Sequence, residues 1–249
     1  MMFSSYVAIG DSFSEGMGDD LPDGSVRGWA DLVALGLAQA SAEPVTYANL
    51  AIRGKLLAPI VGGQLEAALA LHPQLLSING GGNDIMRPRV SIASVADGLE
   101  RAVDTATASG MHVLLVSGAN PSRHLPMGAL MRSRGDQLAV AVKARLPKQN
   151  VTWVDNWSDV ELGELQYWSR DKLHLNALGH ARVAANVLTA LNVPVPTIPA
   201  ADSDIARPQA AAYWREYVLP WIGRRLTGRS SGDNREPKRA TLQPVDVSS

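Results

Sequence analysis

The sequence predicts an α/β protein in three layers (α/β/α), with a mainly parallel five-stranded sheet between two layers of helices. Two observations lead to this fold class. Short, partly β-branched apolar runs, typical of strands buried on both faces, alternate along the chain with longer segments of helical periodicity. Strict alternation of strands and helices implies parallel strands joined by right-handed crossovers. The chain has 249 residues, of which 46% are apolar, and this suffices for a sizeable core.

Each predicted strand is a short apolar run. The first, residues 6–9 (YVAI), stops at Gly10, and the third, residues 75–79 (LLSIN), is followed by three glycines. In chain order, strands are expected at residues 6–9, 47–52, 75–79, 112–117 and 151–154.

The intervals between the strands, and one segment after the last strand, carry apolar residues at helical spacing. Helices are expected at residues 30–41, 55–71, 91–109, 127–145 and 177–191. Asn176 stands directly before the last of these segments, and asparagine is a favoured N-cap residue. Residues 1–195 are therefore expected to form one domain.

The character of the chain changes after Leu191. Prolines at 194, 196 and 199 predict an extended strap, and the aromatic stretch at residues 208–226 predicts a helix packed on the domain or on a second subunit of a homo-oligomer. Strap and C-terminal helix together are assigned to residues 196–227. Membrane-surface binding is the alternative, because three arginines follow the aromatic residues. Residues 228–249 have little to bury and are expected to be disordered.

Charge and composition indicate which partners and which compartment to expect for the protein. The formal net charge of −1 gives no basic footprint of a nucleic-acid binder. The absence of cysteine excludes disulfides and fits a reducing compartment. The N-terminus lacks the pattern of a signal peptide, and no apolar stretch approaches the ~20 residues of a membrane span. We therefore expect a cytoplasmic protein with no integral membrane segment and no nucleic-acid partner.

Four short segments, far apart in the sequence, carry polar residues or glycines at predicted strand ends or before a helix. They are residues 10–14 (GDSFS), 49–54 (NLAIRG), 80–84 (GGGND) and 171–174 (DKLH). Open α/β sheets bind ligands in the crevice at the carboxyl ends of their strands, so position alone makes Ser12 a candidate. Taken singly, each segment also fits a turn, a loop or a helix cap without chemical consequence.

Asp171 and His174 lie three residues apart on a loop that enters the last predicted helix. This spacing lets a carboxylate reach one imidazole nitrogen while the other nitrogen points into a cleft, as the base and its orienting group do in a catalytic triad. A surface pair or a helix cap is the alternative for the spacing alone.

In order and content, the four segments resemble the GDSL family of lipases and acylhydrolases, also called SGNH hydrolases. The resemblance covers residues 6 to about 191 and implies that family's flavodoxin-like fold, with residues 1–195 as the hydrolase domain. It implies a triad of Ser12 as nucleophile, His174 as general base and Asp171 as orienting group. It implies an oxyanion hole formed by the backbone N–H of Ser12, the backbone N–H of Gly54 and the side-chain amide of Asn83. No metal or cofactor is implied.

Two positions depart from the family pattern. Phe13 replaces the leucine of the four-letter name, which leaves the nucleophile untouched, and Leu175 follows His174 where many members carry proline.

A small-molecule ester with a short acyl or acetyl group is the expected substrate, because no single segment indicates a lid or a long acyl channel. The candidate substrate-binding residues follow the third and fourth strands and are Met86, Arg87, Arg123 and His124. An acyltransferase that uses the same triad stays open. An inactive SGNH-fold binding protein would be expected to lack a triad member, and none is missing here.

Overall fold

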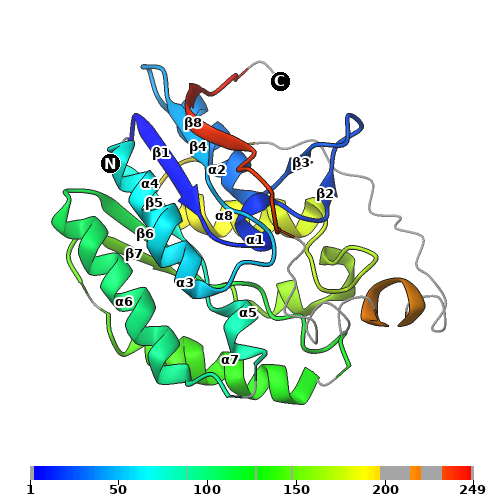
Figure 1. The fold of residues 1–249 in the computed structure, drawn as a ribbon. Coiled ribbons are helices and arrows are strands. Elements are labelled where there is room, and N and C mark those ends of the chain that lie inside the picture. The colour runs from blue at the N-terminus through cyan, green and yellow to red at the C-terminus, as the bar shows by residue number, and fades with distance from the viewer. Residues whose placement is uncertain are drawn as a thin grey trace.

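A six-stranded sheet forms the centre of the protein, in the order β7-β6-β5-β1-β4-β8 (Figure 1). The computed structural model describes residues 3–87, 89–126, 128–146, 148–196, 214–219 and 232–247. The strands of the sheet are β1 (Ser5–Ile9), β4 (Thr46–Asn49), β5 (Leu75–Ile78), β6 (His112–Val116), β7 (Val151–Val154) and β8 (Arg239–Pro244). The first five are parallel, and β8 pairs antiparallel with β4.

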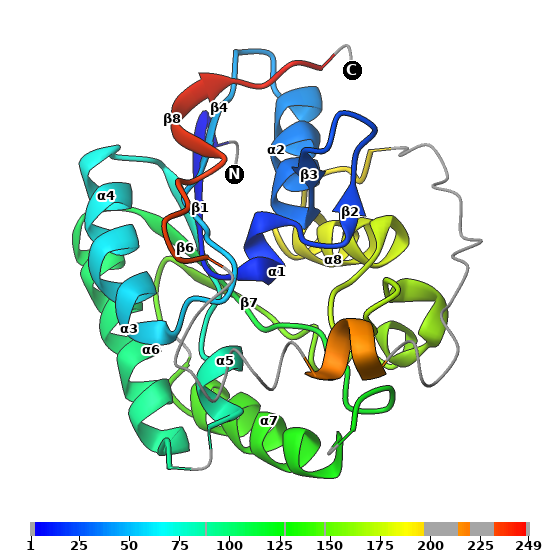
Figure 2. The same cartoon turned by 45° about the vertical axis from the view of Figure 1, so that its right-hand side comes forward.

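Helices cover both faces of the sheet (Figure 2). One face packs against α2 (Trp29–Ala40) and α8 (Ala177–Ala190), and the other against α4 (Leu65–Ala70), α6 (Ile92–Ala108) and α7 (Gly128–Lys143). The position of β1 inside the sheet explains why its sequence is apolar on both faces. Tyr6 and Ala8 belong to the first core and Val7 and Ile9 to the second, as expected for side chains that alternate across a strand buried on both faces.

Shorter elements complete the fold. Residues 57–70 wind continuously through α3 (Leu57–Pro59), the π-helical segment Ile60–Gln64 and α4. Single turns α1 (Ser12–Glu15) and α5 (Gly82–Ile85) follow β1 and β5, and a small hairpin joins β2 (Asp19–Asp20) to β3 (Val26–Arg27). The remaining turns are Glu161–Gly163, Leu165–Tyr167 and the π-helical Trp214–Val218. None of the described helices combines the length and apolar character that crossing a bilayer requires.

The predicted three-layer fold and its parallel strands are confirmed, and each strand begins and ends within about three residues of its expected bounds. The predicted number of five strands is wrong, because residues 239–244 form β8 on the free edge of β4. Disorder was expected at residues 228–249, and the described part of that range contradicts it. The polar sequence of β8 (RATLQP) gave no apolar signal, since the strand gains its place through backbone pairing with an edge strand.

Most of the predicted strap and C-terminal helix lies outside the described residues. Within residues 196–227, the structure describes Pro196 and residues 214–219, which include the π-helical segment. The expected packing of a helix over residues 208–226 therefore stays a prediction.

Candidate active site

The loops that follow β1, β4 and β5 and the loop before α8 meet at the carboxyl edge of the sheet (Figure 1). Ser12 is the first residue of α1, directly after β1. Asp11 caps this turn, because its Oδ1 accepts a hydrogen bond from the backbone N–H of Phe13 over 3.0 Å. The side chain of Gln64 holds the end of β1, since it accepts from the N–H of Gly10 (2.8 Å) and donates to its carbonyl oxygen (3.0 Å).

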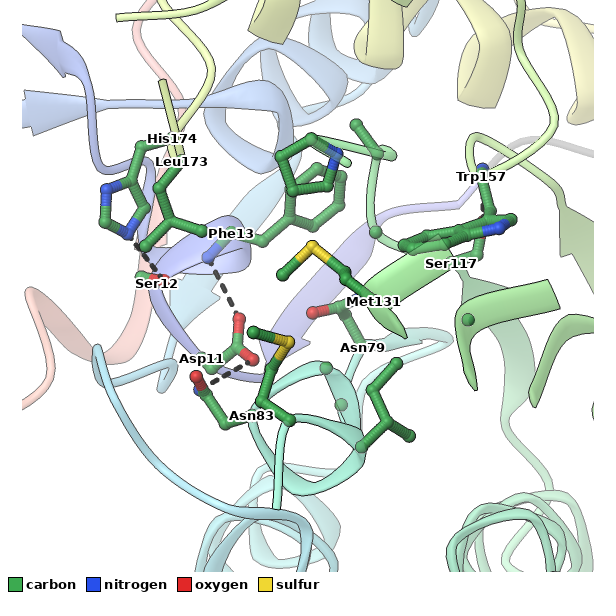
Figure 3. Close-up of a pocket in the computed structure, with 18 of the residues that line it drawn as sticks. Asp11, Ser12, Phe13, Asn79, Asn83, Ser117, Met131, Trp157, Leu173 and His174 are labelled. Atoms are coloured by element: carbon green, nitrogen blue, oxygen red, sulfur yellow. Dashed lines mark hydrogen bonds between the residues drawn. The ribbon is translucent and has the colours of Figure 1, made fainter. Parts of the chain in front are cut away.

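Ser12, His174 and Asp171 form one chain of hydrogen-bonding distances, of which Figure 3 shows the contact between Ser12 and His174. The Oγ atom of Ser12 lies 3.1 Å from Nε2 of His174, and Nδ1 of His174 lies 2.5 Å from Oδ2 of Asp171. Ser12 and His174 are 162 positions apart in the sequence, whereas Asp171 and His174 are 3 positions apart. The arrangement has the connectivity of a serine, a base and a carboxylate that orients the base.

The loop that carries His174 is shaped by the Asp171 carboxylate. Its Oδ1 atom accepts hydrogen bonds from the hydroxyl of Ser169 (2.7 Å) and from the backbone N–H groups of Leu173 and His174 (2.9 Å each). Leu175, which stands in place of the proline common in the family, is buried and forms a β-bridge with Trp168. The bridge and the Asx-type turn hold the imidazole toward Ser12.

The pKa values of this pair move in opposite directions. Burial opposes the charged form of His174, but the carboxylate of Asp171 outweighs burial, so the pKa of His174 lies above its ordinary value of 6.5. Burial would raise the pKa of Asp171, yet His174 and the two backbone N–H donors hold that pKa well below its usual range. Asp171 therefore stays ionised and ready to stabilise an imidazolium.

The candidate oxyanion donors lie on three neighbouring loops. Gly54 has a φ of 73°, and Gly81, which begins the turn that carries Asn83, has a φ of 90°; both values favour glycine. Within the described part of the chain, no hydrogen bond uses the backbone N–H of Ser12 or of Gly54. The amide of Asn83 donates to Oδ2 of Asp11 (3.2 Å) and to the carbonyl oxygen of Lys55 (3.0 Å). The same amide would therefore have to turn or share these bonds to reach an oxyanion.

An ion pair that the sequence did not reveal supports the loop of Gly54. The buried carboxylate of Glu15 accepts from the backbone N–H of Arg53 (2.6 Å) and from its guanidinium Nε (2.8 Å), and it also bonds Nη2. Glu15 ends α1, so one carboxylate connects the turn of Ser12 to the residue before Gly54. The two partners are 38 positions apart, and no local pattern signals such a pair.

A cavity of about 590 Å³ opens beside Ser12 and His174. Two of the four candidate substrate-binding residues, Met86 and Arg87, line it. The other two do not. Arg123 pairs with Glu164 at 3.3 Å, and the Nε2 atom of His124 lies 3.0 Å from the carbonyl oxygen of Gly163.

Two polar residues near the site, Asp84 and His180, have hydrogen-bond partners within the protein. Asp84 accepts from the backbone N–H of Leu57 (2.8 Å). His180 is fully buried, with Nδ1 accepting from the N–H of Trp29 (3.2 Å) and Nε2 donating to the carbonyl oxygen of Met17 (3.1 Å). Burial lowers the pKa of His180 to about 4, so this imidazole is neutral and serves to join α8 to the α1 and α2 loops.

Solved structures of known enzymes share the fold. The lipase Lip_vut3 from a goat rumen metagenome matches with a TM-score of 0.63 at 16% identity, over 75% of this chain and 96% of that one. A catalytic mutant of Axe2, an acetylxylan esterase from Geobacillus stearothermophilus, matches with a TM-score of 0.64 at 19% identity, over 78% and 97%. TesA matches with a TM-score of 0.61 at 25% identity, over 75% and 97%. A comparison with curated proteins found no match.

The family comparison agrees with these structures. The model of the GDSL-like lipase/acylhydrolase family matches residues 8–182, which include all four segments singled out in the sequence. Members of that family are serine hydrolases that act on esters. The chain belongs to the GDSL-like lipase/acylhydrolase family.

Proposed function

We propose that this protein is a serine esterase that cleaves carboxylic esters through an acyl-enzyme on Ser12. The observation that carries the proposal is the unbroken sequence of contacts from Ser12 Oγ to His174 Nε2 (3.1 Å) and from His174 Nδ1 to Asp171 (2.5 Å). Family membership supports it, and so do the structural relatives, which include a lipase and an acetylxylan esterase.

In the first half of the proposed reaction, the Oγ atom of Ser12 attacks the ester carbonyl carbon and its proton passes to Nε2 of His174. The carbonyl electron pair moves onto oxygen, and the resulting oxyanion accepts hydrogen bonds from the N–H groups of Ser12 and Gly54 and from the Asn83 amide. When the tetrahedral intermediate collapses, the alcohol leaves with the proton from His174. The acyl group then remains on Ser12.

In the second half, water takes the place of the alcohol. His174 removes a proton from water as the water oxygen attacks the acyl carbon, and it returns that proton to Ser12 Oγ when the carboxylic acid leaves. Asp171 keeps the same tautomer of His174 throughout and stabilises the imidazolium by its charge. These roles use only side chains and backbone groups of this chain.

The test is hydrolysis of p-nitrophenyl acetate, butyrate and octanoate by the purified protein and by Ser12→Ala. We expect the variant to lose at least about 10³-fold in kcat on each ester. Ser14→Ala is the matched control, because Ser14 lies in the same turn and its buried hydroxyl has no hydrogen-bond partner in the described structure. Equal activity of the wild type and Ser12→Ala would overturn the proposal.

A further inference from the structure

The cavity beside Ser12 extends along one face of α7. The residues of α7 that line it are Met131, Gly135, Leu138, Ala139 and Val142. Their spacing places them on one side of a helix. Gly135 and Ala139 are small. The Trp157 indole packs on Gly135, where a Cβ atom would lie 1.9 Å from Cζ2 of that ring, so Trp157 forms part of the cavity wall at this position.

The opposite wall of the cavity is also apolar. Leu115 and Val116 from the end of β6, Trp153 from β7 and Leu99 from α6 line it, and Leu115 and Val116 are buried. These residues come from separate elements, so no single stretch of sequence signals the cavity. Since no single segment of the chain is rich enough in apolar residues to indicate a long acyl channel, the sequence alone indicated a short acyl group.

Figure 3 shows how this space relates to the catalytic residues. Ser12 and His174 lie at one end of the view and Trp157 at the other, with Met131 between them. Two polar side chains along this path have partners within the protein: the amide of Asn79 donates to the carbonyl oxygen of Val116 (2.9 Å), and the hydroxyl of Ser117 accepts from the N–H of Trp157 (2.9 Å). The buried indole N–H of Trp153 has no hydrogen-bond partner among the described residues. Apart from this indole N–H, the walls beyond the triad offer a ligand mainly apolar contact.

The charged groups of the cavity are of a different kind. Asp11, Asp171 and His174 belong to the proposed nucleophile turn and its base, and Arg53 is paired with Glu15 beside Gly54. Arg87 and Glu216 also line the cavity, and both are exposed to solvent. Polar chemistry thus surrounds the serine, and apolar surface extends away from it. This division fits an ester whose carbonyl sits at Ser12 and whose hydrocarbon chain points away from the triad.

We propose that the α7 cavity, defined by the five α7 residues and by Leu99, Leu115, Val116 and Trp153, binds an unbranched acyl chain of medium length. This inference rests on the proposed function, because Ser12 fixes the carbonyl end. A volume of about 590 Å³ holds far more than an acetyl group. At about 30 Å³ for a group the size of a water molecule, this volume corresponds to roughly twenty groups. With half of that space left to the alcohol, the acyl chain would have roughly eight to ten carbons.

The first test is the chain-length profile of kcat/KM on p-nitrophenyl esters from acetate to laurate. We expect kcat/KM to rise by up to roughly fourfold for each added methylene until about eight to ten carbons, and then to level off or fall. A profile that is highest for acetate and falls from there, with Ser12→Ala inactive on every ester, would overturn the acyl-chain proposal and leave the serine esterase standing.

The second test fills the cavity. Ala139→Phe places a ring inside it, and we expect the ratio of octanoate to acetate kcat/KM to fall at least tenfold. Val140→Phe adds the same ring to the adjacent position of α7, which is 69% exposed and outside the cavity lining, and should leave that ratio unchanged. An equal effect of both variants on the ratio would contradict the proposal.

A binding measurement separates this inference from the proposed reaction. Trp153 and Trp157 line the cavity, so decanoate should change the tryptophan fluorescence of both the wild type and Ser12→Ala, and acetate should not. Decanoate binding by a protein that hydrolyses no ester would overturn the proposed function and retain the cavity assignment. No response to decanoate, in a protein whose esterase activity depends on Ser12, would overturn the cavity assignment alone.

Discussion

Two opposing effects set the pKa of His174: burial disfavours the charged imidazole, and the Asp171 carboxylate favours it. In its proposed role as general base, His174 must be neutral before it takes the proton of Ser12. Activity should therefore be present above the pKa of His174 and lost as the pH falls through it. Since that pKa lies above 6.5, the acid limb of the wild-type profile should lie above pH 6.5.

Asp171→Asn tests this balance directly. An amide cannot stabilise the imidazolium by charge, and it can favour the wrong tautomer, so we expect kcat on p-nitrophenyl butyrate to fall about 10³–10⁴-fold. Without the carboxylate, burial dominates, and the acid limb of the residual activity should move to lower pH. The measurement is kcat/KM against pH, with the exposed Asp23→Asn as control. An acid limb that stays in place would show that Asp171 does not set the pKa of His174.

Asn83→Ala addresses the oxyanion hole. Because the amide would strengthen its hydrogen bond only as the oxyanion forms, its loss should lower kcat by about 10²–10³-fold and change KM little. The amide also bonds Asp11 and Lys55, so circular dichroism and Tm should accompany the kinetics. An unchanged kcat would assign Asn83 a purely structural role in holding Asp11 and Lys55.

Among the helices and strands, the connection between β8 and α1 has a direct consequence for the site. Lys238, directly before β8, donates to the carbonyl oxygen of Glu15 (2.6 Å), to Oδ2 of Asp31 (2.7 Å) and to the carbonyl oxygen of Val26 (3.1 Å). Glu15 is the last residue of the turn that begins at Ser12. One ammonium group therefore ties the nucleophile turn, the β2–β3 hairpin and α2 to the C-terminal strand.

Lys238→Met should lower stability by about 1–3 kcal/mol at pH 8, because it leaves these acceptors without their donor. Burial raises the pKa of Asp31, and Lys238 counteracts this effect. In the variant the Asp31 carboxylate lacks this cation, so the loss of stability is largest at a pH where the carboxylate is ionised. The difference in Tm between variant and wild type should thus shrink from pH 8 toward pH 5. Lys143→Met, on the exposed side of α7, is the control. A Tm difference independent of pH would remove Asp31 from the explanation.

The features that could be predicted from the sequence are set by residues close together in the chain, and those that could not depend on contacts between distant residues. The five parallel strands have apolar side chains on two faces, so their own composition revealed them. β8 has mostly exposed side chains and only one, Leu242, that packs against the core; the strand is held by pairing with β4, which no local pattern records. The Glu15–Arg53 pair and the α7 cavity likewise join residues from separate elements. Ser12 was singled out by its position at a strand end, and Asp171 and His174 by their spacing before the last helix; the family resemblance points to the same three residues, which the structure brings together.

For the chain as a whole, the C-terminal segment returns to the half of the sheet that carries the nucleophile, although it lies outside the family match at residues 8–182. Besides the pairing of β8 with β4, the N–H of Val245 donates to the carbonyl oxygen of Val45 (2.9 Å). Gly232 approaches the loop of Gly54 so closely that a Cβ atom would lie 2.1 Å from the carbonyl oxygen of Arg53. The segment thus braces both loops whose backbone N–H groups are proposed as oxyanion donors.

A chain that ends at residue 231 should therefore lose more than a surface strand. It exposes the edge of β4, removes Lys238 from the acceptors around α1 and removes the contact behind Arg53. We expect Tm to fall by several degrees and kcat on p-nitrophenyl butyrate to fall more than tenfold, measured at a temperature where the shortened protein is still folded. A chain that ends at residue 247 keeps every one of these contacts and should match the full-length protein. If the chain ending at 231 retained full kcat despite a lower Tm, the segment would stabilise the fold without positioning the site. Loss of support for the proposed oxyanion loops would have to lower kcat.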